Sequence, residues 1–189
     1  MNFVNHSKLE GLHAPFSASS SAWLRYDDDK ILKVYRNKQN AVMGTKLHAW
    51  AKTTIDLGIR QPRSKKTLYA YVNDAIGFRM NTEVVLFYSE HFFGTADAIS
   101  FRNNFLRIHD LKTGISGNIE EHIEQLEIYA ALFCLEYRVK PGDLDGVELR
   151  VYKTDEILVH RPDADRILHI MDRIIHLDKI LAEYDEEEA

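Results

Sequence analysis

The residues of this sequence that are best suited to chemistry lie in a short stretch near its middle, "RIHDLKTG" at residues 107–114. Asp110 and Lys112 stand two positions apart at the end of an apolar, strand-like run. Because alternate side chains of a strand share one face, this spacing sets a carboxylate beside an ammonium group. The carboxylate can bind a divalent metal ion, and the ammonium can hold a phosphate oxygen or orient a water next to the ion. An ordinary ion pair at a strand end is the alternative.

A second carboxylate joins this pair through a predicted hairpin. Two strand-like segments flank Asn103 and Asn104, and asparagine suits a two-residue turn because it tolerates positive φ. The register that follows from this turn places Asp97 opposite Asp110. Like charges directly opposed across a sheet are unfavourable, so the pattern favours a cation between them. Carboxylates are hard oxygen ligands, which suit Mg²⁺ or Mn²⁺.

The elements around the hairpin are expected to form one α/β domain, with a central mixed β-sheet flanked by helices. Residues 27–40 read as a strand or an exposed turn, and a short helix is expected from about Ser19. Asn118 is expected to cap the helix that follows the hairpin. The expected helices are residues 41–57, 67–80, 118–139 and 163–184, and the expected strands are 82–93, 94–101, 105–112, 147–153 and 156–162.

Composition limits the class of protein. The 189 residues include one cysteine, Cys134, which excludes a disulfide framework, a four-cysteine zinc site and a cysteine-ligated iron–sulfur cluster. No apolar run approaches the roughly 20 residues of a membrane span, and the start lacks a signal-peptide core. We therefore expect a soluble, cytoplasmic protein with no membrane association.

Charge is unevenly distributed. The net charge of −5 comes from the last residues, so that residues 1–182 carry as many acidic as basic side chains. We expect one domain over residues 1–182 with a helical N-terminal part, and a frayed acidic tail over 183–189. A neutral body neither requires nor excludes a nucleic-acid partner. A basic loop is the best candidate for phosphate contacts, with a merely solvated loop as the alternative; its residues are Arg60, Arg63, Lys65 and Lys66.

Four short motifs follow one another in an informative order. They are "GTKLH" at 44–48, "GTAD" at 94–97, "DLKTG" at 110–114 and "QLEIY" at 125–129. Together they resemble the RecB-like branch of the PD-(D/E)XK nuclease superfamily, over about residues 13–160. The serine-rich "FSASSSAW" resembles the start of its phage and CRISPR-associated exonuclease members. Ala96 stands where the superfamily's name has proline, and the cysteines of the cluster-bearing relatives are missing.

The resemblance implies a restriction-endonuclease-like core and a set of site residues. Lys112 would be catalytic with the two aspartates, while Gln125 and Tyr129 would contact the scissile strand or position Lys112. These last two residues are four apart, so they share one helix face. One or two Mg²⁺ or Mn²⁺ ions, without an iron–sulfur cluster, would be bound by His48, Asp97, Asp110 and the backbone carbonyl of Leu111.

The function implied is a metal-dependent DNA exonuclease acting in phage or mobile-element recombination, replication or repair. Its partner would be single- or double-stranded DNA ends, in a bacterial or phage-infected cell. A homo-oligomer or a recombination partner protein is left open. The alternative is a nuclease-fold protein that grips DNA ends or a partner protein without cutting. An intact Lys112 argues against that alternative, because a non-catalytic copy has no chemical need for it.

Overall fold

The computed structural model describes residues 7–9, 14–18, 20–114 and 118–188. The chain divides into two compact units, Met1–Thr45 and Lys46–Ala189. The sheet and the candidate site both lie in the second unit. The expected helix start at Ser19 lies outside the described residues, and a 3₁₀ helix, η2, occupies Ser21–Arg25.

The first unit contains η1 (Ser7–Leu9), η2 and the start of α1 (Asp28–Asp56), which continues into the second unit. The strand or turn expected at residues 27–40 is therefore wrong, because this segment is helical. Asp27 caps the helix, its carboxylate accepting a hydrogen bond of 2.8 Å from the amide of Lys30. Asp28 and Asp29 place negative charge at the positive end of the helix dipole. The segment lacks an apolar stripe, which explains why the sequence did not indicate a helix.

The second unit is built on a five-stranded sheet whose strands lie in sequence order. The pair β3–β4 is parallel and the other three pairs are antiparallel. This confirms the predicted α/β fold with a mixed sheet, which is consistent with a restriction-endonuclease-like core. The strands are β1 (Asn81–Phe87), β2 (Phe93–Arg102), β3 (Phe105–Leu111), β4 (Gly146–Tyr152) and β5 (Ile157–His160).

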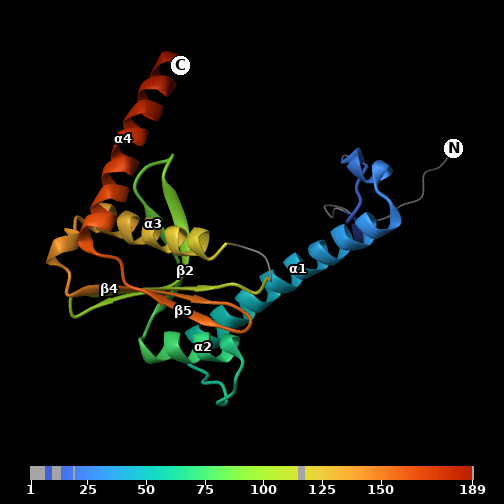
Figure 1. Cartoon of the computed structure of the whole chain (residues 1–189), viewed down its shortest axis with the longest axis horizontal. Coiled ribbons are helices and arrows are strands. Elements are labelled where there is room, and N and C mark those ends of the chain that lie inside the picture. Colours follow the sequence, from blue (N-terminus) through green and yellow to red (C-terminus); the bar gives the residue numbers. More distant parts are fainter. Residues whose placement is uncertain (1–6, 10–13, 19, 115–117, 189) are drawn as a thin grey trace. The chain divides into compact units, whose positions relative to one another are not determined.

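Helices cover both faces of the sheet (Figure 1). The end of α1 and α2 (Thr67–Gly77) pack on one face around Val72 and Tyr152, and α3 (Ile119–Tyr137) packs on the other around Leu126 and Ile108. Helix α4 (Ala164–Glu188) packs against α3, and a short 3₁₀ helix, η3 (Pro141–Asp143), follows α3. None of the described helices is long and apolar enough to cross a bilayer.

The predicted asparagine hairpin is confirmed. Asn103 and Asn104 have φ values of 49° and 55°, as a two-residue turn of this kind requires. The ladder pairs Ala98 with His109, so the next opposed residues at the open end of the hairpin are Asp97 and Asp110. The predicted cap on α3 is also present, since Asn118 accepts a hydrogen bond from the amide of Glu120.

The acidic end of the chain differs from the expected frayed tail, because α4 continues to Glu188. Its last turns are held by His91, in the loop between β1 and β2. The ring nitrogens Nδ1 and Nε2 of His91 lie 3.0 Å from Asp178 and 2.9 Å from Asp185. Tertiary contacts therefore order a segment whose charge alone would favour fraying. The predicted domain boundary at residue 182 stays a prediction.

Candidate active site

Three side chains of types that can ligate a metal converge in the second unit, each from a different element. His48 comes from α1, Glu83 from β1 and Asp97 from β2, and one ligand atom of each lies within 4.8 Å of the others. The closest described approach is 3.5 Å between His48 Nδ1 and Asp97 Oδ2, and these side chains are 31% and 17% exposed. Two of the expected ligands are thus together, at a position that solvent reaches.

Glu83 is a member of this group that the sequence analysis missed. The ladder pair Val84–Ala96 beside it places Glu83 opposite Asp97. Its φ of 51° lies in a region that costs a non-glycine residue about 1–3 kcal/mol, which persists only where the surroundings impose it. The register between β1 and β2 is the feature that pairs these two residues. The loop at residues 88–92 is too long to specify that register from sequence.

Asp110 lies beside this group and has its own partner. The side chain is 3% exposed, and its Oδ1 accepts a hydrogen bond of 3.1 Å from Lys112 Nζ. Its buried Oδ2 lies 3.1 Å from the same ammonium without hydrogen-bond geometry. Burial, and then the charge of Asp97, raise the pKa of Asp110 to about 6. The structure therefore pairs Asp110 with Lys112. Asp110 is not a member of the group of mutually close ligand atoms that His48, Glu83 and Asp97 form.

Leu111 contributes its amide to the site. The N–H of Leu111 donates a 2.9 Å hydrogen bond to Asp97 Oδ2. This bond joins the end of β3 to the neighbouring strand and holds the Asp97 carboxylate in place. Metal ligation by the Leu111 carbonyl stays a prediction.

A chain of hydrogen bonds links Lys112 to α3. Lys112 Nζ donates to Gln125 Oε1 at 2.9 Å, and Gln125 Nε2 donates to Tyr129 Oη at 3.1 Å. Gly94 makes room for this arrangement, because a Cβ at that position would lie only 2.7 Å from Cε1 of Tyr129. The glycine of the "GTAD" motif thus has a steric role. The structure places Gln125 and Tyr129 where they can position Lys112.

Negative charge concentrates around the site. The interaction with Asp97 raises the pKa of His48, and burial offsets only part of that rise. Burial, followed by the charges of Asp97, Asp110 and Glu83, also raises the pKa of Tyr71 on α2. Three carboxylates that act on one buried phenol form the kind of field that a cation would neutralise.

The predicted basic loop is divided between two places. Lys66 lines a hollow of about 210 Å³ together with Lys112 and Thr113. Arg60 lies at the opposite end of α2, where its Nη2 is 4.0 Å from the position of a Cβ on Gly77. Arg63 and Lys65 are exposed on the loop. Of the four, Lys66 is the one that the structure sets beside Lys112.

The donor set fits a divalent cation. It offers one imidazole nitrogen and carboxylate oxygens, and a buried oxygen of Asp110 next to it has no hydrogen-bond donor within the described ranges. Carboxylate oxygens suit Mg²⁺, and a mixed oxygen and imidazole set also suits Mn²⁺. Sulfur ligands are not part of it.

No family model matches this chain. No curated protein matches it either. Among solved structures it is similar to the crystal structure of SSO0001, at 17% sequence identity and a TM-score of 0.37, over 82% of this chain and 67% of that one. A TM-score of this size carries no argument about fold or function.

Proposed function

We propose that this chain is a metal-dependent DNA nuclease, an exonuclease of the RecB-like branch of the PD-(D/E)XK superfamily. It would hydrolyse phosphodiester bonds in phage or mobile-element recombination, replication or repair, in the cytoplasm of a bacterial or phage-infected cell. One observation carries the proposal: the group of His48, Glu83 and Asp97 lies beside the buried Asp110, which pairs with a partly exposed Lys112.

One or two Mg²⁺ or Mn²⁺ ions are the proposed cofactor. His48, Glu83 and Asp97 would hold the ion, and Asp110 is the adjacent carboxylate that the resemblance adds. When bound, the ion would supply Lewis-acid polarisation of the phosphodiester and lower the pKa of the attacking water. The role of Glu83 is additional to the residues that the motifs indicate.

Lys112 is the proposed catalytic group of the chain itself. An ammonium has three N–H donors, and those of Lys112 reach Asp110 Oδ1 and Gln125 Oε1 at 3.1 and 2.9 Å. The remaining donor can contact a phosphate oxygen or the attacking water. Two fixed hydrogen bonds reduce the freedom of a flexible side chain, and this favours a single orientation during catalysis.

Tyr129 and Gln125 are proposed as positioning residues. Tyr129 Oη fixes the amide of Gln125, and that amide in turn presents its oxygen to Lys112. The hollow lined by Lys66 and Lys112 gives the phosphodiester backbone a second cation close by. A DNA strand that passed there would meet positive charge on one side and the ligand group on the other.

The experiment is digestion of linear duplex, circular duplex and single-stranded DNA with Mg²⁺ or Mn²⁺. Asp97→Asn and Lys112→Met should each lower the rate by about 100-fold or more. Asp172→Asn is the matched control, because it removes one exposed carboxylate on α4 and should leave the rate unchanged. An exonuclease would spare the circular DNA. Full activity in both site variants would refute the proposal.

The alternative is a nuclease-fold protein that retains DNA ends or binds a partner protein without hydrolysis. It predicts retention of labelled DNA and no product with any divalent metal. Under that alternative, Lys112→Met would change binding at most. Calorimetric titration with Mn²⁺ then completes the comparison, because the nuclease requires the metal and a pure end-binding protein does not.

A further inference from the structure

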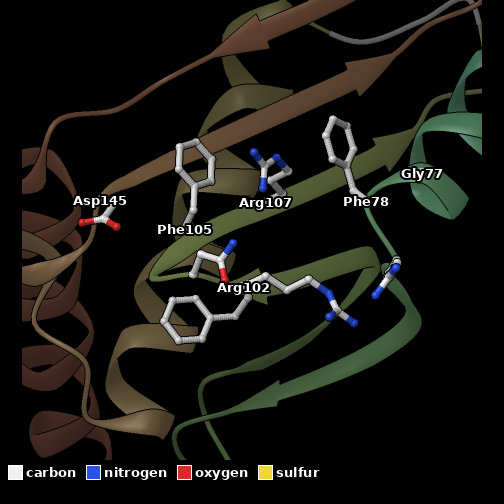
Figure 2. Close-up of a pocket in the computed structure, with 9 residues that line it drawn as sticks. Gly77, Phe78, Arg102, Phe105, Arg107 and Asp145 are labelled. Carbon is white, nitrogen blue, oxygen red and sulfur yellow. The ribbon is translucent and has the colours of Figure 1, made fainter.

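A second hollow of about 810 Å³ lies at the turn of the β2–β3 hairpin (Figure 2). Asp97 and Asp110 lie at the opposite, open end of this hairpin. The hollow is formed by the end of α2 and the residues after it, the hairpin turn with the start of β3, and Asp145 just before β4. Its side walls combine basic and aromatic side chains. These include Phe78, Arg79, Phe101, Arg102, Phe105 and Arg107.

Arg107 is held between two aromatic rings, as Figure 2 shows. Its guanidinium carbon lies 4.1 Å from the ring centre of Phe105 and 4.6 Å from that of Phe78. Its nearest acid is Glu148, with 3.9 Å between Nε and Oε1, and the buried Nε has no hydrogen-bond partner in the described part of the chain. Stacking occupies the faces of the guanidinium, so its edge donors are available to an anion.

Positive charge exceeds negative charge in this pocket. Arg79 and Arg102 are exposed, and neither pairs with an acidic side chain among residues 20–114 and 118–188. Among the residues that the structure describes, Asp145 is the one acidic side chain that lines the pocket. Arg60 approaches the rim at Gly77. A locally basic hollow on a chain of net charge −5 indicates an anionic ligand that carries several phosphates.

The aromatic rings add a second kind of contact. Phe105 packs closely on Gly146, since a Cβ at that glycine would lie only 2.7 Å from Cε2 of the ring. Phe101 is 42% exposed although it packs on Phe133, with ring centres 5.1 Å apart. An exposed ring beside arginines suits an unpaired nucleobase, because stacking on an aromatic side chain contributes about 1–3 kcal/mol per base.

We infer that this pocket, which we call the arginine pocket, binds a single-stranded segment of nucleic acid. Arg79, Arg102 and Arg107 would contact phosphates, and Phe101 would stack on a base. Arg102 is five residues from Asp97 along β2, or roughly 17 Å, so the pocket would hold the strand a few nucleotides from the metal group. The inference deepens the proposed nuclease function and rests on it for the identity of the ligand.

The test measures binding of a fluorescent single-stranded oligonucleotide of about 20 nucleotides by anisotropy, with Ca²⁺ in place of Mg²⁺. Arg79→Ala combined with Arg102→Ala should raise Kd about tenfold and lower the salt slope by about two. The control combines Arg173→Ala with Lys179→Ala, which removes two exposed charges from α4 and should change Kd less than about twofold. Circular dichroism checks that both variants are folded.

A second variant tests the aromatic contact. Phe101→Leu should weaken binding of the single strand severalfold and leave binding of a duplex of the same sequence unchanged, because paired bases are not free to stack. Equal effects on both would overturn the stacking role. A mononucleotide that displaced the oligonucleotide at equal concentration would overturn the strand-binding inference and indicate a nucleotide site.

Failure of the inference and failure of the proposed nuclease are distinguishable. If the wild-type protein digests DNA and the arginine-pocket variant binds the oligonucleotide as tightly as the control, the inference is wrong and the nuclease stands. If the wild-type protein binds through the pocket but digests no DNA with Mn²⁺, the nuclease is wrong and the pocket stands. Hydrolysis of bis(p-nitrophenyl) phosphate, too small to reach both places, should be equal in the wild-type and arginine-pocket proteins.

Discussion

Gly94→Ala is the most informative small change at the candidate site. The new methyl group would lie 2.7 Å from Cε1 of Tyr129, and 3.6 and 3.7 Å from Cδ1 and Cζ. Carbon atoms prefer about 3.5–4.0 Å, so the ring must move by about 1 Å. Gly94 does not have a positive φ, so its backbone accepts alanine and would by itself gain about 0.4–1 kcal/mol of stability. A loss of stability would therefore report the contact with the ring.

The magnitude follows from what the ring holds. Overpacking costs about 1–3 kcal/mol, and a 1 Å shift lengthens the 3.1 Å bond between Tyr129 and Gln125 beyond hydrogen-bond range. Losing that bond adds about 0.5–1.5 kcal/mol. Gln125 would then hold Lys112 less firmly, and a misplacement of this size lowers a reaction rate by about 100-fold. We expect a net destabilisation of about 1–3 kcal/mol and a nuclease rate reduced by ten- to a hundredfold.

The assay is urea unfolding followed by circular dichroism, with DNA digestion in parallel. Gly142→Ala is the control, because a Cβ there meets no atom within 4 Å. In a Tyr129→Leu background, where the ring is absent, Gly94→Ala should no longer destabilise the protein. The reasoning is refuted if Gly94→Ala costs the same free energy in both backgrounds, or if it stabilises the wild-type protein.

Three further predictions concern single residues. Glu83→Gln should weaken Mn²⁺ binding by about tenfold or more in calorimetry; unchanged affinity would remove Glu83 from the ligand group. Burial raises the pKa of Glu148, but hydrogen bonds from Arg161 and Arg150 outweigh burial, so the pKa lies below its usual value of 4.5. Its stabilising contribution should therefore be complete above pH 4.5 and be lost as the pH falls below that value, and urea unfolding of Glu148→Gln should show a weaker acid dependence. The carboxylates of Asp178 and then Asp185 raise the pKa of His91, so its NMR titration should lie above pH 6.5 and move down in Asp178→Asn; no movement would contradict the contact.

The hairpin and its helix could be predicted from sequence because their determinants are local. Asn103 and Asn104 specify the turn, the turn specifies the register, and the register opposes Asp97 and Asp110. Gln125 and Tyr129 share a helix face through a spacing of four. These relations need only a few neighbouring residues and the repeat of a strand or helix, so the printed order of residues determines them.

The helix at residues 27–40 and the helical acidic end could not be predicted in this way. The first has an exposed, mixed surface without an apolar stripe, and the second is held by His91 from a loop more than eighty residues earlier. Periodicity detects burial, so it gives no signal where a helix is exposed. Contacts between distant segments leave no periodic trace at all.

The sequence by itself therefore determined the asparagine turn, the Asp110–Lys112 pair and the capped helix that carries Gln125. Only the tertiary structure decided that Glu83 completes the group of His48 and Asp97, and that α2 and the hairpin turn enclose the arginine pocket. The physical reason is that turns and strand or helix repeats act over a few residues. A ligand group or a pocket depends on how whole elements pack, and many side chains far apart in the chain set that packing together.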